Sequence, residues 1–335
     1  MSDIISISSA ETLPAIFALY RWGIELIQGI QGIQSAGLTA FVKAFTALGT
    51  ELLYIPALLL LFWCVNEKKG AHLGFIVILS VFANGFFKDL LKQPRPFALE
   101  PSVGLAFEPS YGIPSGHAQL SLCFVLPLAI WAGRSKFARS GGAKAAIRLG
   151  AALFILCIAF TRLYLGVHFP TDILAGWLLG GVVLGLWFLL EPRTAPLLET
   201  GGLRSRMIAA AAAVIGMNAL YPAGRSLGGL FLGFGAGCAL MSERFPFSAA
   251  SGSVSVRLVR YALGLAGGAL IYLVLKLAFP GEDSLFSALP YWGASSPYYD
   301  LGRFLQYGLL GFWAAALAPR LFLRLGLAEK VSGGA

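Results

Sequence analysis

Three short clusters of polar and charged residues interrupt an otherwise apolar sequence, and their residue types could bind and attack a small anion. The first spans residues 88–96 (KDLLKQPRP), the second 114–117 (PSGH) and the third 161–172 (TRLYLGVHFPTD). Two of the chain's three histidines fall within them. Ionisable residues at membrane depth are costly and usually mark function, so chance grouping is a poor explanation.

The basic residues of these clusters suit a small tetrahedral anion. Lys88 supplies a point charge, while Arg95 and Arg162 supply planar guanidinium groups that match phosphate oxygens. Ser115 and Gly116 open a helix, where backbone N–H groups favour an anion. We therefore expect these five residues to surround one phosphate group.

The third cluster holds a histidine and a carboxylate four residues apart. Asp172 follows His168 across Pro170, which places it at the start of the next helix. A carboxylate there can accept a hydrogen bond from one imidazole nitrogen and leave the other free as a nucleophile. We therefore predict that His168 is a nucleophile oriented by Asp172.

The rest of the chain is suited to crossing a membrane several times. Its 335 residues are 57% hydrophobic and 12% charged, with a mean hydropathy of +0.76, whereas a soluble domain has about twice that charged fraction. The apolar residues fall in blocks near the roughly 17–25 residues that cross a bilayer. The sequence predicts an all-α, polytopic membrane helix bundle of about nine spans, at residues 51–66, 71–91, 117–133, 149–168, 172–190, 207–222, 227–242, 258–279 and 302–321.

The first fifty residues differ from this pattern. Residues 13–34 mix apolar side chains with Arg21, Glu25 and Gln28, which predicts an amphipathic helix lying in the interface, with one further weak span as the alternative. We divide the chain into an interfacial segment, a core with the three clusters, a linker loop and a C-terminal bundle of unassigned role, at residues 1–50, 51–190, 191–206 and 207–335.

The net charge of +9 is explained by membrane orientation, so nucleic acid is not expected as a partner. Sixteen of the 25 Lys and Arg residues fall on one side of the predicted spans, at Lys68, Lys69, Arg134, Lys136, Arg139, Lys144, Arg148, Arg193, Arg204, Arg206, Arg244, Arg257, Arg260, Arg320, Arg324 and Lys330. We expect this side to be cytosolic, with the three clusters on the opposite face. Short loops, with no cleavable signal peptide and no glycosylation sequon, favour a bacterial inner membrane and a periplasmic or exterior site.

The motifs KX6RP, PSGH and (S/T)RX5HX3D, in this order, resemble the three-part signature of the type 2 phosphatidic acid phosphatase/haloperoxidase superfamily, in its membrane lipid-phosphatase branch. The resemblance covers residues 51–190. It implies that His168 forms a phosphohistidine, that Asp172 orients it, and that His117 protonates the leaving oxygen and then activates water. It also implies that no metal or other cofactor is needed, because the phosphate oxygens are held by Lys88, Arg95, Ser115, Gly116 and Arg162. Thr161 stands where the family usually has serine, so the hydroxyl is kept.

The predicted function is hydrolysis of a lipid phosphate or pyrophosphate monoester, because an anchored substrate reaches a site at headgroup depth by lateral diffusion. Candidate substrates are undecaprenyl or other polyprenyl pyrophosphate, phosphatidic acid, phosphatidylglycerol phosphate and sphingoid-base phosphate. Three alternatives stay open. The chain could act on a soluble sugar phosphate, since its order of elements is similar to glucose-6-phosphatase. It could instead be a lipid headgroup phosphotransferase, or a non-enzymatic lipid-phosphate transporter or scaffold.

Other features have structural interpretations. Small residues recur at spacing four and predict helix-packing faces or a homodimer surface, at Gly176/Gly180, Gly181/Gly185, Gly229/Gly233/Gly237 and Gly264/Gly268. The four cysteines are expected to be buried, without a disulfide or zinc site. His72 is expected to be an interface anchor. The 17 residues 97–113 are either a lid, whose Phe107 and Tyr111 touch a substrate chain, or an interfacial anchor.

Overall fold

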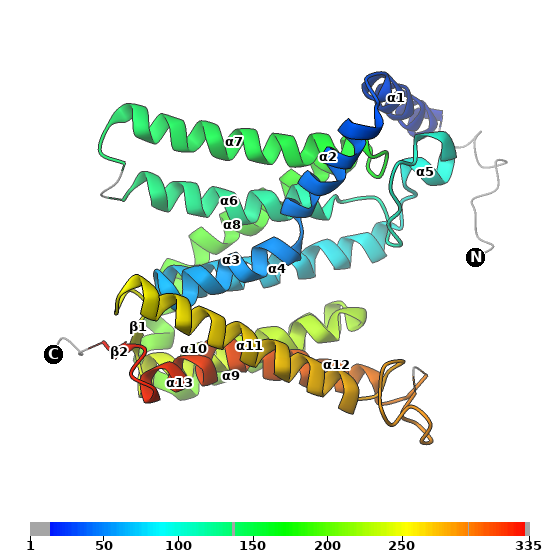
Figure 1. The fold of residues 1–335 in the computed structure, drawn as a ribbon. Coiled ribbons are helices and arrows are strands. Elements are labelled where there is room, and N and C mark those ends of the chain that lie inside the picture. The colour runs from blue at the N-terminus through cyan, green and yellow to red at the C-terminus, as the bar shows by residue number, and fades with distance from the viewer. Residues whose placement is uncertain (1–13, 136–137, 294, 332–335) are drawn as a thin grey trace. The chain divides into compact units, whose positions relative to one another are not determined.

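The computed structural model describes residues 14–135, 138–293 and 295–331, which form an almost entirely helical chain (Figure 1). In these ranges the strands are two short segments, β1 (Phe247–Ser248) and β2 (Glu329–Lys330), which pair antiparallel. The predicted all-α class is confirmed. Lys136, one of the basic residues expected on the cytosolic side, lies outside the described residues. The first 13 residues, which belong to the expected interfacial segment 1–50, also lie outside them.

The chain forms two compact units, each assembled from two stretches of sequence. Unit 1 comprises Met1–Leu53 and Ala83–Val182, and unit 2 comprises Tyr54–Phe82 and Val183–Ala335. The limits of the units therefore fall inside helices. The division of the chain after residues 50, 190 and 206 rests on composition. The roles given to the four resulting segments stay predictions.

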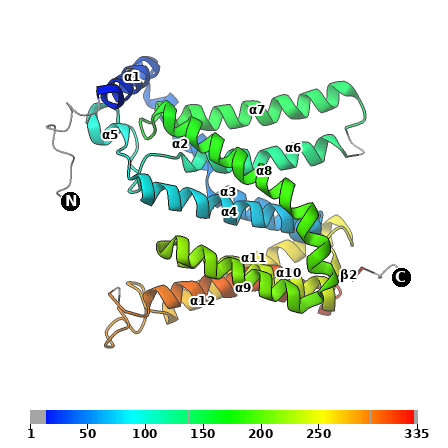
Figure 2. The ribbon, with the colours of Figure 1, turned by 180° about the vertical axis from the view of Figure 1, so that it is seen from behind.

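Unit 1 contains all three polar clusters. Its elements are α1 (Pro14–Gln31), α2 (Ala36–Thr46), η2 (Ala47–Gly49), the end of α4 (Glu67–Leu91), α5 (Pro96–Leu99), η3 (Pro101–Val103), α6 (Gly116–Gly133), α7 (Gly141–Tyr164) and the start of α8 (Pro170–Thr200). α6 and α7 lie side by side (Figures 1 and 2). The clusters occupy the end of α4, the start of α6, the end of α7 and the start of α8, so this packing brings them to one end of the unit.

Unit 2 is a helical bundle with a closely packed glycine face. It contains most of α3 (Glu51–Cys64), the start of α4, the end of α8, α9 (Gly202–Leu220), η4 (Pro222–Gly224), α10 (Arg225–Arg244), α11 (Val254–Ala278), α12 (Tyr299–Phe312), the π-helical turn η5 (Trp313–Leu317) and α13 (Ala318–Arg324). A Cβ added to Gly229 would lie 2.1 Å from the Phe304 carbonyl oxygen, and one added to Gly233 would lie 1.8 Å from that of Gly308. The predicted packing role is confirmed here, because only glycine lets α10 approach α12 this closely.

The Gly233→Ala substitution is expected to destabilise the protein by at least about 2 kcal/mol, because its methyl group would overlap backbone that cannot move aside. Thermal unfolding in detergent measures the change. Gly181→Ala is the matched control. Nothing lies within 4 Å of a Cβ at that position, so the control should leave stability unchanged or raise it by up to about 1 kcal/mol. Equal melting temperatures for Gly233→Ala and wild type would contradict the close packing.

The other small-residue pairs differ in what surrounds them. Gly176 and Gly264 are also closely packed. An added Cβ would lie 2.6 Å from the Ser115 carbonyl oxygen at Gly176 and 2.4 Å from the Trp63 ring at Gly264. Gly181 and Gly185 have nothing within 4 Å of an added Cβ. The homodimer stays a prediction, and it now concerns the Gly181/Gly185 face.

The number of membrane spans is lower than the nine expected. Among the described residues, seven helices are long and apolar enough to cross a bilayer, or eight if one bent pair counts as a span. That pair is Ala36–Gly49 with Glu51–Cys64, bent by 42°, so the span expected at 51–66 is the second helix of a bent pair. The stretch expected as a span at 302–321 is helical throughout, from α12 through the π-helical turn η5 into α13, but it is not among the candidate spans. α1 is not among the candidate spans, which leaves the amphipathic interpretation. The prediction of a multi-pass membrane protein is confirmed.

The segment 191–206, expected as a loop, is helical on both sides of Gly201. α8 continues to Thr200 with Pro192 and Pro196 inside it, and α9 begins at Gly202. A proline removes one backbone hydrogen-bond donor from a helix without necessarily ending the helix. The turn is made instead by Gly202, whose φ of +62° suits glycine.

Candidate active site

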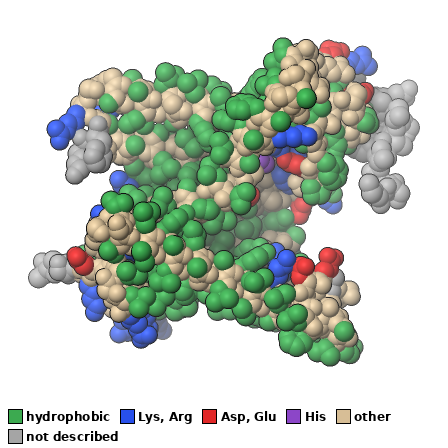
Figure 3. Space-filling view, viewed as in Figure 1, with side chains coloured by type: hydrophobic (Ala, Val, Ile, Leu, Met, Phe, Trp, Pro, Cys, Tyr) green, Lys and Arg blue, Asp and Glu red, His purple; other side chains and the backbone are tan. Residues whose placement is uncertain are grey.

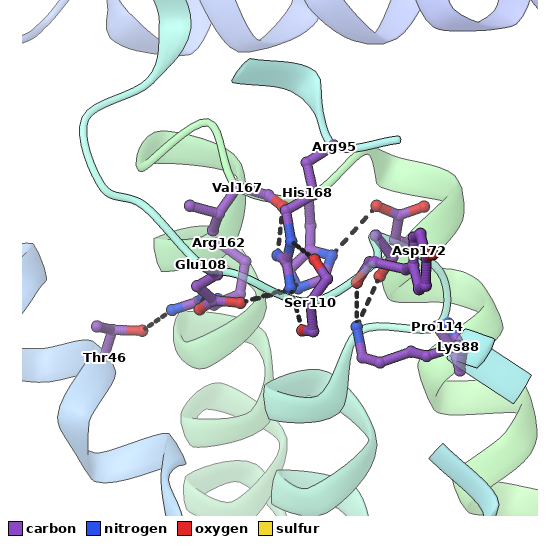
Figure 4. Close-up of polar contacts among 12 residues, drawn as sticks. Thr46, Lys88, Arg95, Glu108, Ser110, Pro114, Arg162, Val167, His168 and Asp172 are labelled. Carbon is purple, nitrogen blue, oxygen red and sulfur yellow. Dashed lines mark hydrogen bonds and ion pairs between the residues drawn. The ribbon is translucent and has the colours of Figure 1, made fainter. Parts of the chain in front are cut away.

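The three clusters meet at one end of unit 1 (Figure 4). Helix ends supply the functional side chains, so their positions are fixed by the packing of α4, α6, α7 and α8. Side chains of the following residues are brought together: Lys88, Arg95, Arg162, His168 and Asp172.

His168 is held between a carboxylate and a guanidinium group. Its ring is 1% exposed, and Nδ1 lies 3.1 Å from Oδ2 of Asp172, which also accepts the backbone N–H of Phe169 at 2.9 Å. Nε2 lies 3.2 Å from Nη1 of Arg95. Because a guanidinium group can only donate, Nε2 must accept, and the ring proton is assigned to Nδ1. The lone pair of Nε2 is therefore directed toward Arg95.

Arg95 is the most extensively bonded cation of the site. Besides His168, its guanidinium group donates to the carbonyl oxygen of Ser110 at 2.6 Å, the hydroxyl of Ser110 at 3.0 Å and the carbonyl oxygen of Val167 at 2.8 Å. Arg95 is the extended residue before α5, with Pro96 following it, which restricts its backbone. The side chain is thus preorganised for an anion.

Arg162 is tied to α2 through a threonine. Its Nη1 donates to Oγ1 of Thr46 at 2.8 Å, and its Nε has no hydrogen-bond partner among the described residues. The Thr161 hydroxyl donates to the Ile158 carbonyl at 2.6 Å and lies 3.0 Å from Oγ1 of Thr46. The hydroxyl that replaces the family's serine therefore joins α7 to α2.

Glu108 was not among the expected site residues, yet its carboxylate contacts both arginines. Oε2 lies 2.8 Å from Nη2 of Arg95, and Oε1 accepts from Nη2 of Arg162. Oε2 is also 3.9 Å from Nε2 of His168. The carboxylate thus lies between the two arginines that the sequence predicts to hold a phosphate group. Its only signal in the sequence was its place between the first two motifs.

Lys88 holds the loop that precedes α6. Its ammonium group donates to the carbonyl oxygens of Tyr111 and, at 3.2 Å, of Gly112. An ammonium group has three protons, so one remains for an incoming anion. Lys88 therefore combines a structural role with a charge beside the other cations.

The second motif is fixed by buried polar contacts. The Ser115 N–H donates to the Asp172 carbonyl at 2.9 Å, and Asn84 donates to the carbonyl oxygen of Pro114 at 3.2 Å and to Gln119 at 2.8 Å. The Ser115 hydroxyl is buried and has no partner among the described residues, so it is available to a ligand. His117 is partly buried at the start of α6 beside Gly49, where an added Cβ would lie 3.1 Å from its ring.

Burial holds the pKa of His168 well below its ordinary value of 6.5, and the positive charges of Arg95, Arg162 and Lys88 lower it further. The ring therefore stays neutral through the neutral pH range, which is the state in which Nε2 can act as a nucleophile. An imidazole kept neutral in the fold takes up its proton on unfolding, so this site also predicts lower stability below pH 6.5.

With His168 as the predicted nucleophile, the acid limb of kcat/KM is expected to lie below pH 6.5, because protonation would occupy the lone pair of Nε2. A pH profile of phosphate release measures it. The substrate phosphate ionises in the same range, so two substrates whose phosphate pKa values differ should be compared. A limb that stays at or above 6.5 for both substrates would contradict a neutral, buried His168.

α1 packs against the turn that carries His168. Tyr20 stacks on Phe169 with ring centroids 5.0 Å apart, and the Gln31 amide donates to the carbonyl oxygens of Val103 and Tyr164 at 2.9 and 2.8 Å. These contacts were not anticipated from the amphipathic pattern. The N-terminal helix therefore supports the site directly.

The other residues discussed in the sequence analysis lie outside the cluster of charged side chains. His72 lies 3.7 Å from Glu191 and against the edge of Trp187 in unit 2, as a non-catalytic residue would. Phe107 is 77% exposed and Tyr111 39%, which leaves both the lid and the anchor interpretations as predictions. Cys157 is exposed on α7 and Cys238 is half-buried, which corrects the expectation that all four cysteines are buried.

Comparison with known proteins places both parts of the chain in one family. The PAP2 superfamily model matches residues 69–195, and the model described as PAP2 superfamily phosphatase, transmembrane extension, matches residues 225–330. The first match contains all three motifs. The chain belongs to the PAP2 superfamily.

Curated relatives match about half of the chain. Lipid phosphate phosphatase delta from Arabidopsis thaliana is 29% identical over 49% of this chain and 41% of its own length. Undecaprenyl-diphosphatase from Sulfolobus acidocaldarius is 29% identical over 48% of this chain and 73% of its own length. Glucose-6-phosphatase 3 from Rattus norvegicus is 30% identical over 42% and 43%, respectively. The chain thus spans less than half the length of the plant and rat relatives.

Proposed function

We propose that this chain is an integral membrane phosphatase that hydrolyses a lipid phosphate or pyrophosphate monoester through a phosphohistidine. The observation that carries the proposal is the geometry of His168, whose Nδ1 bonds Asp172 while Nε2 faces Arg95. A buried neutral imidazole with its lone pair beside two guanidinium groups suits attack on an anion that those groups hold.

The reaction proceeds in two balanced steps. In the first, Nε2 of His168 forms a bond to phosphorus while the bond from phosphorus to the leaving oxygen breaks, and His117 gives that oxygen a proton. In the second, His117 takes a proton from water, whose oxygen attacks phosphorus and releases Nε2. Asp172 stabilises the positive charge that the imidazole carries in between.

Protein cations supply the charge neutralisation in this scheme. Arg95 offers the Nη2 donor that contacts Glu108, and Arg162 offers its Nη2 donor and its Nε, which has no partner among the described residues. Lys88 adds a third positive charge, and Ser115 with the Gly116 N–H begins α6 beside them. We propose that these groups stabilise the transition state without a metal ion.

The surroundings of the site favour a lipid substrate. Its residues lie at the ends of membrane-spanning helices, and large apolar side chains are exposed near it, among them Leu90, Leu99 and Phe107. An acyl or prenyl chain can cover such a surface while the phosphate enters between the cations. We further propose a bacterial inner membrane, with the site on the face opposite the Lys- and Arg-rich side.

Phosphate release by the purified full chain in detergent, with and without EDTA, tests the proposal. The substrates are a polyprenyl pyrophosphate, phosphatidic acid, phosphatidylglycerol phosphate, sphingosine phosphate and glucose 6-phosphate, which is included because of the rat relative. Release from a lipid that EDTA does not reduce is expected. Release from glucose 6-phosphate alone would replace the lipid assignment, and no release by folded protein would overturn the phosphatase.

A further inference from the structure

A groove of about 820 Å³ lies in unit 1 between α6 and α7, away from the active site. Leu126 and Ile130 of α6 and Ile155 of α7 form part of its lining, and Trp177 of α8 also contributes. The groove is formed within one unit and mostly by apolar side chains. It is thus suited to hydrocarbon.

The lining follows one stripe on each helix. On α6, Leu126 follows Leu122 by four residues and Gly133 follows Leu126 by seven, which places the three on one face of the helix. From residue 122 to residue 133 the helix rises about 16 Å. This is close to half of the roughly 30 Å hydrocarbon core, which is the depth of one leaflet.

One end of the groove is basic. Arg134 at the end of α6, and Lys144 and Arg148 in the first turns of α7, complete its lining. All three are exposed, and none forms an ion pair with another described residue. No Asp or Glu occurs between Glu108 and Asp172 in the sequence. Figure 3 shows basic side chains at this end of α6 and α7.

The basic end lies one membrane thickness from the active site. His117 opens α6 and Arg134 caps its other end, and the 17 intervening steps rise about 25 Å. An active site at one interface therefore places these cations at the other interface. A lipid that binds here belongs to the leaflet opposite the active site.

We propose that the groove binds one anionic phospholipid of that leaflet. Its phosphate is held by Arg134, Lys144 and Arg148, and its acyl chains lie along the α6 and α7 stripes toward Trp177. The depth of one leaflet fits a phospholipid, and the three cations select an anionic headgroup over a neutral one. The excess of Lys and Arg on the cytosolic side of membrane proteins would explain the three cations alone. It would not explain an apolar groove beside them.

Two sets of variants of the full chain test the site, each with a matched control. Arg134→Gln/Lys144→Gln/Arg148→Gln removes the charge, and Arg193→Gln/Arg204→Gln/Arg206→Gln removes three arginines outside the groove. Gly133→Phe fills the groove, and Gly150→Phe adds the same side chain on α7 outside it. Neither glycine has an atom within 4 Å of an added Cβ, so both variants should fold.

Native mass spectrometry in detergent then counts lipids retained from an equimolar mixture of phosphatidylglycerol and phosphatidylcholine with identical chains. Wild type, both controls and Arg95→Gln are expected to retain phosphatidylglycerol, which separates this site from the active-site cations. The charge variant should lose up to about a hundredfold in affinity, and Gly133→Phe should lose the adduct. Equal retention of the two lipids, or equal losses in a variant and its control, would overturn the proposal. The readout does not depend on turnover.

Discussion

Replacing His168 by alanine is expected to abolish phosphate release, lowering kcat by at least about 10⁴-fold. The substitution removes Nε2, the atom that forms the bond to phosphorus, while Arg95 and Arg162 can still hold the substrate. KM should therefore change much less than kcat. Steady-state and single-turnover release of labelled phosphate from a lipid substrate in detergent measure both effects.

His72→Ala is the matched control for this prediction. It removes a histidine of unit 2 that lies beside Glu191 and Trp187, and it should leave kcat unchanged within about twofold. Asp172→Asn keeps the nucleophile but weakens the control over its tautomer, so its kcat should fall between those of wild type and His168→Ala. Activity of His168→Ala above about one hundredth of wild type would exclude His168 as the nucleophile.

A covalent intermediate distinguishes a nucleophile from a positioning residue. His117→Ala removes the proton donor of the first step and the group that activates water in the second. A pyrophosphate substrate has a phosphate leaving group that depends less on the proton donor, so label from this substrate should accumulate on the protein. No label should be retained when His168 is also replaced. Label that persists in the double variant would place the intermediate on another residue.

The sequence predicted the central pair of the site because local spacing fixes it. His168 and Asp172 are separated by one turn across a proline that starts α8, and the structure places Nδ1 and Oδ2 3.1 Å apart. The cations of the other clusters were predicted as partners because each lies at the end of a span. Their functional roles stay proposals until the variants are measured.

Glu108 could not be predicted in the same way. It lies in the segment 97–113, where short helices and turns have no periodicity that would indicate which side chains point inward. Its contacts depend on where α7 brings Arg162, which is 54 residues away in the sequence. The contacts of Tyr20 and Gln31 with the site are likewise tertiary.

The expected count of about nine spans exceeds the seven or eight found among the described residues because hydropathy does not reveal bends and backbone irregularities. The first predicted span is the second helix of a bent pair, and the last one contains a π-helical turn. The first stretch pairs with the preceding helix at a bend of 42°, and the last runs from α12 through η5 into α13. In the same way, Pro192 and Pro196 suggested a loop where the backbone continues as α8.

Replacing Glu108 by glutamine is expected to tighten the binding of inorganic phosphate by about tenfold or more. Phosphate must displace the Glu108 carboxylate from Arg95 and Arg162, and a charge-assisted hydrogen bond contributes about 1.5–3 kcal/mol. Glutamine removes the negative charge that competes for the two guanidinium groups. Product phosphate should therefore inhibit the variant more strongly than wild type.

The same substitution should lower the stability of the protein without phosphate, because two buried arginines lose their carboxylate partner. Thermal unfolding in detergent at increasing phosphate concentration measures both effects, since a tighter ligand raises the melting temperature at lower concentration. Glu100→Gln is the control, because that carboxylate caps η3 through Ser102. Its phosphate affinity should stay within about twofold of wild type. Weaker phosphate binding by Glu108→Gln would mean that Glu108 positions the arginines for the anion, and that it does not compete with it.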